Sequence, residues 1–377
     1  MTMSATVDAA GALANRAQSL ADGFLTMLPD SDEAAFPAEE FRLLTAAGLL
    51  SAPIVPDNDP HALLRTLKEM GRGNLAVGRI YEGHVNALQL IQTFGTHDGL
   101  ERWSHDTREG RIFAVWNTEA GDGVRLQPLA DGRFRVEGAK TFASGAGHVT
   151  RPIVTGKLPD GGWQMCIVPM ERVQVAIDTS WWQPLGMRAS VSYKVDFTGI
   201  ILDEEDLLGS AGNYHQQPWF SGGAVRFAAV QLGGAEGLLD AARDALRALG
   251  RIDDPYQRQR IGEGAILIES GNQWLRAAAE HVDLSPDAAR ADIPTMLGYA
   301  NMTRTAIETI CLDIIRIVER SVGVRGMLRP SPIERILRDL TMYLRQPAPD
   351  AALAQVGQVA LESARPVGRL WSDDGND

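Results

Sequence analysis

The amino-acid sequence predicts an α+β protein in which one β domain lies between two helical regions. Short segments rich in β-branched and aromatic residues, which are typical of strands, are confined to residues 111–210. On both sides of this block, apolar residues recur at the 3.6-residue spacing of amphipathic helices. We therefore predict an N-terminal all-α domain over residues 1–110, a middle antiparallel β-barrel or β-sandwich domain over residues 111–210, and a C-terminal four-helix-bundle domain over residues 211–377.

The prediction of the middle domain depends on alternation and on turn residues. Phe134 and Val136 alternate with polar neighbours, as expected for a half-buried strand. Asp131-Gly132 and Pro159-Asp160-Gly161 stand between strand candidates, where tight turns favour these residue types. The strand candidates are Arg111–Asn117, Arg133–Val136, Lys140–Ser144, Pro152–Val154, Gln164–Val168, Val173–Ile177 and Tyr193–Leu202.

Three helices are predicted in the N-terminal domain, and the Ala-rich residues 1–20 form either a further helix or a loose arm. The three helices cover Pro37–Leu50, about Pro60–Met70 and about Leu75–Phe94. In the third helix the apolar residues form a stripe at helical spacing, and His84 falls inside that stripe. A histidine in such a stripe is more often a hydrogen-bonded core residue than a catalyst.

Long helices joined by short loops predict an antiparallel bundle in the C-terminal domain. A break is expected at residues 346–350, where two prolines prevent a helix from continuing. Asp350 is then predicted to cap a last helix that ends near Leu361. The helices before the break are predicted at Val225–Leu249, Arg260–His281 and Ile293–Val322, followed by one that opens at Ser331-Pro332.

The composition excludes several classes of protein. The net charge of −12 argues against nucleic acid as a partner, because phosphates would be repelled. No stretch approaches the roughly 20 apolar residues of a membrane span, and the N-terminus lacks the pattern of a secretion signal. Cys166 and Cys311 are the only cysteines, and the seven histidines show no paired spacing, so neither a disulfide scaffold nor a metal site is predicted. We expect a soluble cytoplasmic protein.

Short motifs occur in a fixed order along the chain. Asn117-Thr118-Glu119 ends the first predicted strand, and Lys140–Gly145 forms another strand segment. The further motifs are Pro184–Ser190, Val195–Phe197, Leu208-Gly209, Arg226 with Leu232–Ala235, and Arg338-Asp339. In this order the motifs and the domains resemble the acyl-CoA dehydrogenase superfamily of flavoproteins. The resemblance covers nearly the whole chain and implies that family's fold, with FAD as cofactor.

The resemblance also implies where the flavin would bind. The family holds the isoalloxazine ring at strand ends and the adenine half on an Arg and on a Gly-rich loop of a neighbouring subunit. Arg251 and the segment Gly323–Gly326 match the adenine positions, although Val324 stands where the family usually has Gly. A homodimer or a homotetramer is therefore expected. The residues expected at the ring are Trp116, Asn117, Thr118, Phe142 and Ser144.

The sequence departs from the family at the catalytic base. Dehydrogenation of an acyl thioester requires a carboxylate near the α carbon of the substrate. The two positions that carry this Glu in the family are Pro347 and Val225 here, and neither side chain accepts a proton. Asp122 also lies in the run that meets acyl-CoA in the family, where an acid is a poor neighbour for CoA phosphates.

Two residues are candidates for the missing chemistry. Asp350, three residues beyond the usual position, could act as a displaced base if it does not cap the last helix. His84 and Ser144 resemble residues of the superfamily's flavin-dependent monooxygenase branch, where reduced flavin reacts with oxygen and donors such as Asn117 are needed. That match is partial, because Arg345 and Gln346 stand where a second His is typical.

Three functions therefore stay open. The first is an FAD-dependent oxidoreductase acting on an acyl thioester or a related small substrate, with hydride transfer to flavin N5 and Arg226 in the substrate site. The second is a flavin-dependent monooxygenase that uses reduced flavin and O2. The third is a flavin-binding protein without dehydrogenase chemistry. An electron acceptor or a flavin reductase is the expected partner for the two enzymes.

Overall fold

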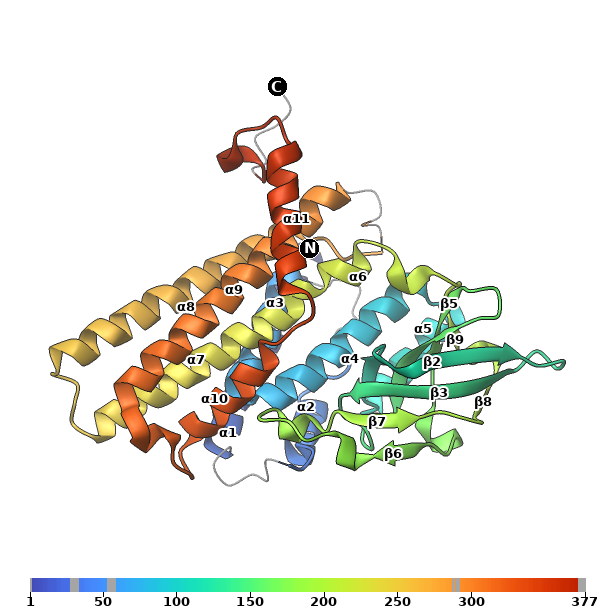
Figure 1. Cartoon of the computed structure of the whole chain (residues 1–377), viewed down its shortest axis with the longest axis horizontal. Coiled ribbons are helices and arrows are strands. Elements are labelled where there is room, and N and C mark those ends of the chain that lie inside the picture. Colours follow the sequence, from blue (N-terminus) through green and yellow to red (C-terminus); the bar gives the residue numbers. More distant parts are fainter. Residues whose placement is uncertain (1, 28–33, 53–58, 287, 289–291, 372–377) are drawn as a thin grey trace.

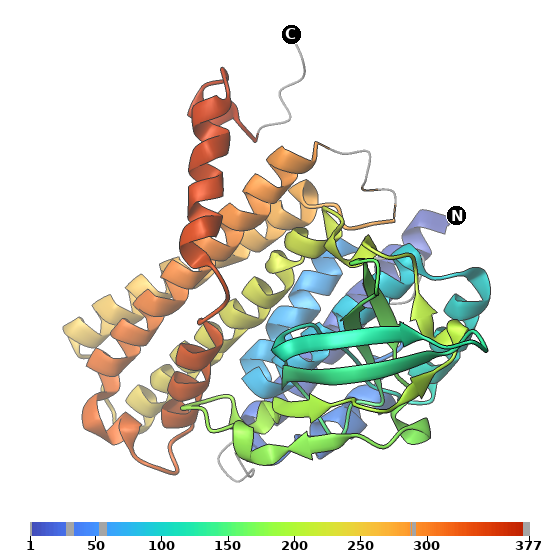
Figure 2. The same ribbon diagram turned by 45° about the vertical axis from the view of Figure 1, so that its right-hand side comes forward.

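The computed structural model describes residues 2–27, 34–52, 59–286, 288 and 292–371. Helices lie before and after one mixed sheet, which confirms the predicted α+β class and the order of its three parts (Figure 1). The sheet lies on one side of α4 (Leu75–Phe94), and the long C-terminal helices lie on the other side (Figures 1 and 2). The domain boundaries near residues 110 and 210 stay predictions.

The N-terminal part contains one helix more than the sequence predicted. Residues 2–20 belong to a helix rather than to a loose arm. The unpredicted helix is α5, whose buried side chains, Trp103 and Thr107, are too few to produce a recognisable apolar stripe. The helices are α1 (Thr2–Met27), α2 (Ala38–Ala46), α3 (Pro60–Gly73), α4 (Leu75–Phe94) and α5 (His97–Arg108).

The start of α4 is fixed by its capping residue. The Asn74 side chain accepts hydrogen bonds from the backbone N–H groups of Ala76 at 3.0 Å and Val77 at 3.4 Å. From this point the helix runs between the sheet and the C-terminal helices with most of its residues buried. Its side chains can therefore reach both neighbours, which makes α4 a wall of any site between them.

The sheet is mixed rather than purely antiparallel. Its order is β6-β7-β3-β2-β4-β5-β9, with β1 paired to β4 and β8 paired to β3. The pairs β1–β4 and β2–β4 are parallel, so the predicted all-antiparallel pairing is wrong for these strands. The strands are β1 (Phe113–Trp116), β2 (Glu119–Pro128), β3 (Phe134–Ala143), β4 (Arg151–Lys157), β5 (Trp163–Ile167), β6 (Ala176–Asp178), β7 (Tyr193–Asp196), β8 (Ile201–Leu202) and β9 (Leu207–Leu208).

The C-terminal helices form the predicted bundle, from which the last helix projects (Figures 1 and 2). The helices are α6 (Trp219–Gly222), α7 (Ala224–Ala248), α8 (Pro255–His281), α9 (Ile293–Val322), α10 (Pro332–Tyr343) and α11 (Pro349–Glu362). The predicted cap of the last helix is wrong. Ala348 occupies the N-cap position, and Asp350 lies exposed in the first turn, where an acidic residue interacts favourably with the helix dipole.

The N-terminal and C-terminal helices share one core because α3 and α7 lie in backbone contact. A Cβ atom at Gly233 would lie 1.8 Å from the carbonyl oxygen of Lys68, and one at Gly71 would lie 2.0 Å from that of Val230. Only glycine permits this approach. The buried apolar cluster therefore continues from α1 through the sheet to α10.

In the described part of the chain, no helix is long and apolar enough to cross a membrane. Within the same residues, no three His, Cys, Asp or Glu side chains are grouped so as to hold a metal ion.

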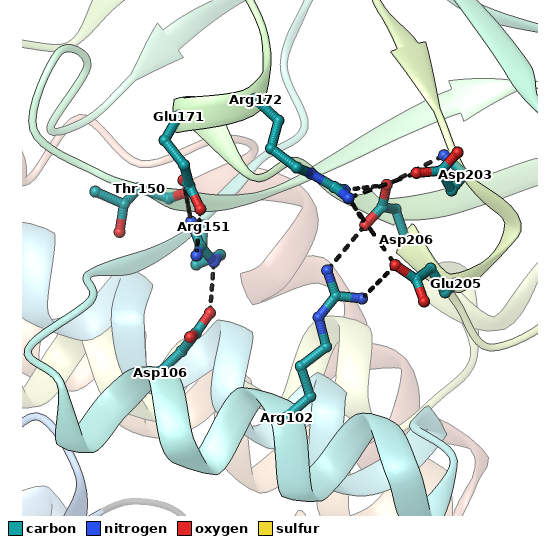
Figure 3. A network of polar contacts seen from close by, with 9 residues as sticks. All are labelled: Arg102, Asp106, Thr150, Arg151, Glu171, Arg172, Asp203, Glu205 and Asp206. Carbon is teal, nitrogen blue, oxygen red and sulfur yellow. Dashed lines mark hydrogen bonds and ion pairs between the residues drawn. The ribbon is translucent and has the colours of Figure 1, made fainter.

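An ion-pair network joins α5 to the far edge of the sheet (Figure 3). Asp206 is fully buried, and its Oδ1 accepts hydrogen bonds from Arg172 Nη2 at 2.6 Å and Arg102 Nη2 at 3.3 Å. On β4, Arg151 Nε lies 2.6 Å from Asp106 Oδ2 of α5. These contacts fix the helix to the sheet beside the strands that carry the candidate site.

We expect Asp206→Ala to lower the free energy of unfolding by about 3 kcal/mol. The substitution removes the buried carboxylate of two guanidinium groups, which keep only the exposed carboxylates of Asp203 and Glu205. The matched control is Glu205→Ala, because Glu205 pairs with the same Arg102 at 3.4 Å but is 66% exposed. In urea denaturation, Glu205→Ala should lower the free energy of unfolding by less than about 1 kcal/mol. Equal losses for the two variants would contradict this account of the network.

Candidate functional site

A polar cavity of about 470 Å³ lies where the ends of the strands meet the helices. Its walls come from β1 and β3 on one side and from α4 and α7 on another. The segment from the end of α10 into α11 completes it, together with α9, Tyr214 and the short helix α6. Segments from all three predicted domains therefore meet at this cavity, and it is the candidate site.

The strand ends at this cavity are held by one buried lysine. Lys140 is fully buried, and its Nζ donates to the carbonyl oxygen of Asn117 at 3.0 Å and to Thr155 Oγ1 at 3.0 Å. Nζ also forms an ion pair with Glu119. Burial lowers the pKa of Lys140, and the hydrogen bond to Glu119 opposes this shift. The lysine thus fixes Asn117 and the adjoining Thr118 at the cavity edge.

An aromatic side chain forms the wall next to these strand ends. Phe142 has a φ of 52°, a left-handed conformation that is unfavourable for a side chain of this size. The pairing of β3 with β7 shifts register at this point, so the side chain turns away from the sheet. Its ring is 46% exposed and meets Trp181 edge to face at 4.8 Å. This geometry presents an aromatic surface toward the cavity.

The helical wall carries a cluster of charged and amide side chains. The Glu82 carboxylate lies between two guanidinium groups, with Oε2 2.8 Å from Arg79 Nη1 and Oε1 3.5 Å from Arg226 Nε. The Arg226 guanidinium also donates to Asn86 Oδ1 at 2.7 Å and to Gln89 Oε1. Arg226 is 4% exposed, and burial lowers its pKa. The predicted substrate residue Arg226 therefore lines the cavity.

Neither of the two positions that carry the catalytic carboxylate in the family has a carboxylate side chain here. Pro347 lines the polar cavity, and its carbonyl oxygen accepts a hydrogen bond from Arg304 Nη2 at 3.0 Å. Val225 is buried and lines a second cavity of about 480 Å³, which is mostly apolar and lies between α3, α4, α5, α7 and α8. Arg226 lines both cavities. Its hydrogen-bonded guanidinium separates the polar space from the apolar one.

His84 lies in the core and not among the cavity residues. Its Nδ1 accepts a hydrogen bond from the backbone N–H of Phe113 at 3.0 Å, and its Nε2 lies 2.7 Å from the carbonyl oxygen of Leu50. Because the first contact makes Nδ1 an acceptor, the proton resides on Nε2, which donates to Leu50. Both ring nitrogens are thus used within the fold, and burial lowers the pKa of His84 to about 4. His84 therefore has a structural role in the core.

The other predicted site residues divide into two groups. Asn117, Thr118 and Phe142 line the cavity, as does Arg226. Trp116 and Ser144 do not, because the Trp116 indole is buried and donates to the carbonyl oxygen of Ser144 at 3.0 Å. The Ser144 hydroxyl is 2.9 Å from that of Ser192, so both predicted residues support the sheet behind the aromatic wall.

The candidates farther along the chain do not meet at the cavity. Asp350 is exposed, and the α11 residues that face the cavity are Ala351, Ala352 and Gln355. Arg251 follows the end of α7, and Gly323 and Gly326 follow the end of α9, both at the end of the bundle away from the sheet (Figure 1). Within one chain the proposed adenine residues therefore lie apart from the ring site.

Sequence reasoning missed several residues of the cavity. Arg79, Glu82 and Asn86 follow one another at intervals of three and four along α4, so they lie on one face of the helix. A polar face within a largely buried helix was the available signal, and it was hidden by the apolar stripe that dominates the same segment. Arg304 and Tyr343 gave no local signal, because only the tertiary fold brings them to the cavity.

The comparisons with known proteins agree with this architecture. Residues 225–345 match the family model described as acyl-CoA dehydrogenase, C-terminal domain. The chain is 24% identical to the dibenzothiophene monooxygenase of Mycolicibacterium goodii over 93% of this chain and 94% of that protein. The chain also superposes on TdsC from Paenibacillus sp. A11-2, solved with FMN and indole, with a TM-score of 0.83, 19% identity and coverage of 96% and 99%. Methanesulfinate monooxygenase MsuC from Pseudomonas fluorescens gives a TM-score of 0.81, 19% identity and coverage of 95% and 99%.

Fold, site and comparisons together define a flavoprotein architecture of helices, sheet and helical bundle. Over most of its length the chain is similar to dibenzothiophene monooxygenases and to a putative acyl-CoA dehydrogenase, and these likenesses support a flavoprotein of the acyl-CoA dehydrogenase superfamily. The residues at the cavity fit the ring of such a cofactor. Phe142 offers an aromatic wall, Pro347 and Ala348 an apolar one, and the side chains of Asn117 and Thr118 stand at its edge as polar partners.

The titration of His84 gives a prediction for stability. Its pKa is about 4 in the folded protein and near 6.5 when unfolded, so the unfolded chain binds the proton more readily. This contribution to stability is complete above the unfolded pKa and is lost as pH falls from 6.5 toward 4. Between about pH 7.5 and about pH 5, the free energy of unfolding should drop by about 2 kcal/mol from this residue.

The measurement compares urea denaturation of the natural protein and of His84→Gln at the two pH values. Glutamine can donate to Leu50 but does not titrate, so the variant should lose about 2 kcal/mol less on acidification. An identical pH dependence for both proteins would show that His84 does not titrate as its burial implies.

Proposed function

We propose that this protein is a flavin-dependent monooxygenase that inserts one oxygen atom of O2 into a small organic substrate. The observation that carries the proposal is the absence of a free carboxylate among the described cavity residues. Both base positions of the family lack one, and the Glu82 carboxylate faces guanidinium groups with both oxygens. Among the described cavity residues, no unpaired carboxylate is therefore available to accept a proton in acyl-thioester dehydrogenation, whereas oxygen transfer does not need one.

The chemistry divides between cofactor and protein. Reduced flavin, when bound, supplies the two electrons with which O2 is split, so that one oxygen atom enters the substrate and the other leaves as water. The protein's task is to hold the ring against Phe142 and to place the substrate on the opposite side, near Arg226 and Tyr343. The surrounding helices limit the access of water. A separate flavin reductase is the expected source of the reduced cofactor.

The comparisons are compatible with both reactions, and several of them support oxygen transfer. A relative that aligns over nearly the whole chain is a dibenzothiophene monooxygenase, and two proteins of the same fold are TdsC and methanesulfinate monooxygenase. Dehydrogenation is the second candidate, because Glu82 is a carboxylate in the cavity and the C-terminal helices match the acyl-CoA dehydrogenase family model. For Glu82 to act as a base, its ion pairs with Arg79 and Arg226 would have to open.

We propose FAD as the flavin, bound across two copies of the chain in a homodimer or homotetramer. Arg251 and the Gly323–Gly326 segment would receive the adenine half from a neighbouring copy, since they lie far along the bundle from the ring site of their own chain. FMN lacks the adenine and would use the ring site alone. TdsC, solved with FMN, supports this simpler alternative. Equal affinities for FMN and FAD in a titration would remove the case for an adenine site.

We expect Phe142→Gly to weaken flavin binding at least tenfold without lowering the stability of the flavin-free protein. The substitution removes the aromatic surface, whose contact with the flavin is worth on the order of 1–3 kcal/mol of binding free energy. Glycine also adopts the φ of 52° without strain, so the fold should not be weakened. Flavin affinity is measured by fluorescence titration, and stability by urea denaturation. The control is Tyr256→Ala, which removes an aromatic side chain that is 70% exposed on α8. Unchanged flavin affinity in Phe142→Gly would mean that the ring does not lie against this wall.

A second prediction separates the two reactions. Straight-chain acyl-CoAs added without oxygen should reduce the bound oxidised flavin slowly or not at all, because a positioned base contributes roughly 10²–10⁴-fold in rate. With reduced flavin and ¹⁸O2, an organosulfur substrate should gain one labelled oxygen atom, detected by mass spectrometry. Rapid flavin reduction by an acyl-CoA would overturn the proposal, and Glu82→Gln would then identify the base.

A further inference from the structure

The polar cavity has the opposite charge from the protein as a whole. The chain carries a net charge of −12, yet the charged side chains that line the cavity within the described residues are Arg79, Arg226 and Arg304 against Glu82 alone. Three guanidinium groups and one carboxylate leave an excess of two positive charges. Charges that face a cavity with low-dielectric walls focus their field on what enters it. The site is therefore built to attract a negative charge.

The innermost part of this charge is incompletely neutralised. Arg226 and Glu82 are 4% and 6% exposed, and both Arg79 and Arg226 depend on the single Glu82 carboxylate. The remaining partners of Arg226 are the neutral amide oxygens of Asn86 and Gln89. Neutral amides satisfy N–H groups but do not cancel charge, so one positive charge stays uncompensated in a buried position. Such a charge is costly unless a further anion joins it.

Two buried donors at the cavity lack partners. Arg226 Nε lies within ion-pair distance of Glu82 but forms no hydrogen bond, and the Tyr343 hydroxyl has no hydrogen-bond partner within the described residues. Tyr343 is 5% exposed and lines the same cavity. Burial raises the pKa of its hydroxyl, so this group donates a proton in a hydrogen bond rather than losing it. A ligand with acceptor oxygens would satisfy both donors at once.

We propose that Arg79, Arg226 and Tyr343 form a subsite for the anionic head of the substrate, an oxyanion of the sulfinate or carboxylate class. This inference rests on the proposed function, because it names the substrate class of that same site. A planar guanidinium matches a pair of acceptor oxygens, and a hydroxyl donor completes their coordination. With its head held here, the substrate's reacting atom faces the aromatic wall across the cavity. Arg226 separates the head from the apolar cavity behind it, so a short substrate fits and a long straight tail does not.

The test measures anion binding to the flavin-loaded protein by calorimetry in a low-chloride buffer. Benzenesulfinate and benzoate are the probes, and methyl phenyl sulfoxide and benzamide are their neutral counterparts. The anions should bind at least tenfold more tightly than the neutral compounds. Equal affinities within each pair would overturn the proposal.

Substitutions in the cluster should shift anion affinity in opposite directions. Arg79→Gln removes a positive charge and Asn86→Asp adds a negative one beside Arg226, so each should weaken anion binding about tenfold. Glu82→Gln removes the negative charge that partly neutralises the cluster, so it should tighten anion binding by a similar factor. General damage to the site would weaken binding in all three variants, and that result overturns the proposal. Asn86→Asp serves as the variant that keeps the fold intact, because it gives Arg226 a second carboxylate.

The matched controls change charge far from the cavity. The controls are Arg243→Gln near the end of α7 and Glu269→Gln on α8, which change the net charge by the same amounts as Arg79→Gln and Glu82→Gln. Neither control should change anion affinity more than about twofold, because exposed and distant charges are screened by salt. The phosphate of the flavin is the competing anion. If it occupies the cluster, Arg79→Gln will weaken flavin binding and leave benzenesulfinate binding unchanged, which overturns the proposal.

The same titrations on flavin-free protein separate this proposal from the proposed function. If the protein binds no flavin but still binds benzenesulfinate with the predicted response to Glu82→Gln, the function fails and the anion subsite stands. If flavin binds and oxygen transfer occurs but the anions show no preference, the subsite fails and the function stands.

Discussion

The buried ammonium group of Lys140 is the interaction on which the sheet side of the site depends. An ammonium group loses its hydration when it is buried, and its burial is tolerated only when charges and acceptors replace the water. Glu119, the carbonyl of Asn117 and the Thr155 hydroxyl replace it here. These partners lie on β2, at the end of β1 and on β4, so the strands are brought to one point. The edge residues of the cavity are placed as a consequence.

The helical side of the site depends on a different constraint. The glycines at the α3–α7 contact bring two backbones together, and α4 packs beside them. This places Arg226 of α7 against the polar face of α4, where Glu82, Asn86 and Gln89 receive it. Hydrogen bonds to both amides fix the orientation of the guanidinium. The cavity thus lies between a wall fixed by a buried lysine and a wall fixed by a buried arginine, with α11 projecting beyond it.

Much of the fold could be predicted from the sequence, because helices with apolar stripes and strands with turn residues carry local signals. The parallel pairing of β1 with β4 could not be predicted from the sequence, because strands that pair in this way lie far apart along the chain. The helix α5 was missed because it buries few side chains. At the site, Asn117, Thr118, Phe142 and Arg226 line the cavity, and their roles in binding stay predictions. Trp116 and Ser144 share those segments but face the core, as His84 does on α4, a distinction that only side-chain direction reveals.

The fate of His84 shows why a residue type cannot define a mechanism. The sequence offers a titratable group on the helix that lines the site, but its two ring nitrogens join α4 to the loop at Leu50 and to the first strand at Phe113. Glu82, two residues earlier, lies on the opposite side of the helix and reaches the cavity. Residues two apart on a helix point about 200° apart, so one faces the core and the other the site. Chemistry on α4 therefore belongs to the face of Arg79, Glu82 and Asn86, where the charge that selects a ligand is concentrated.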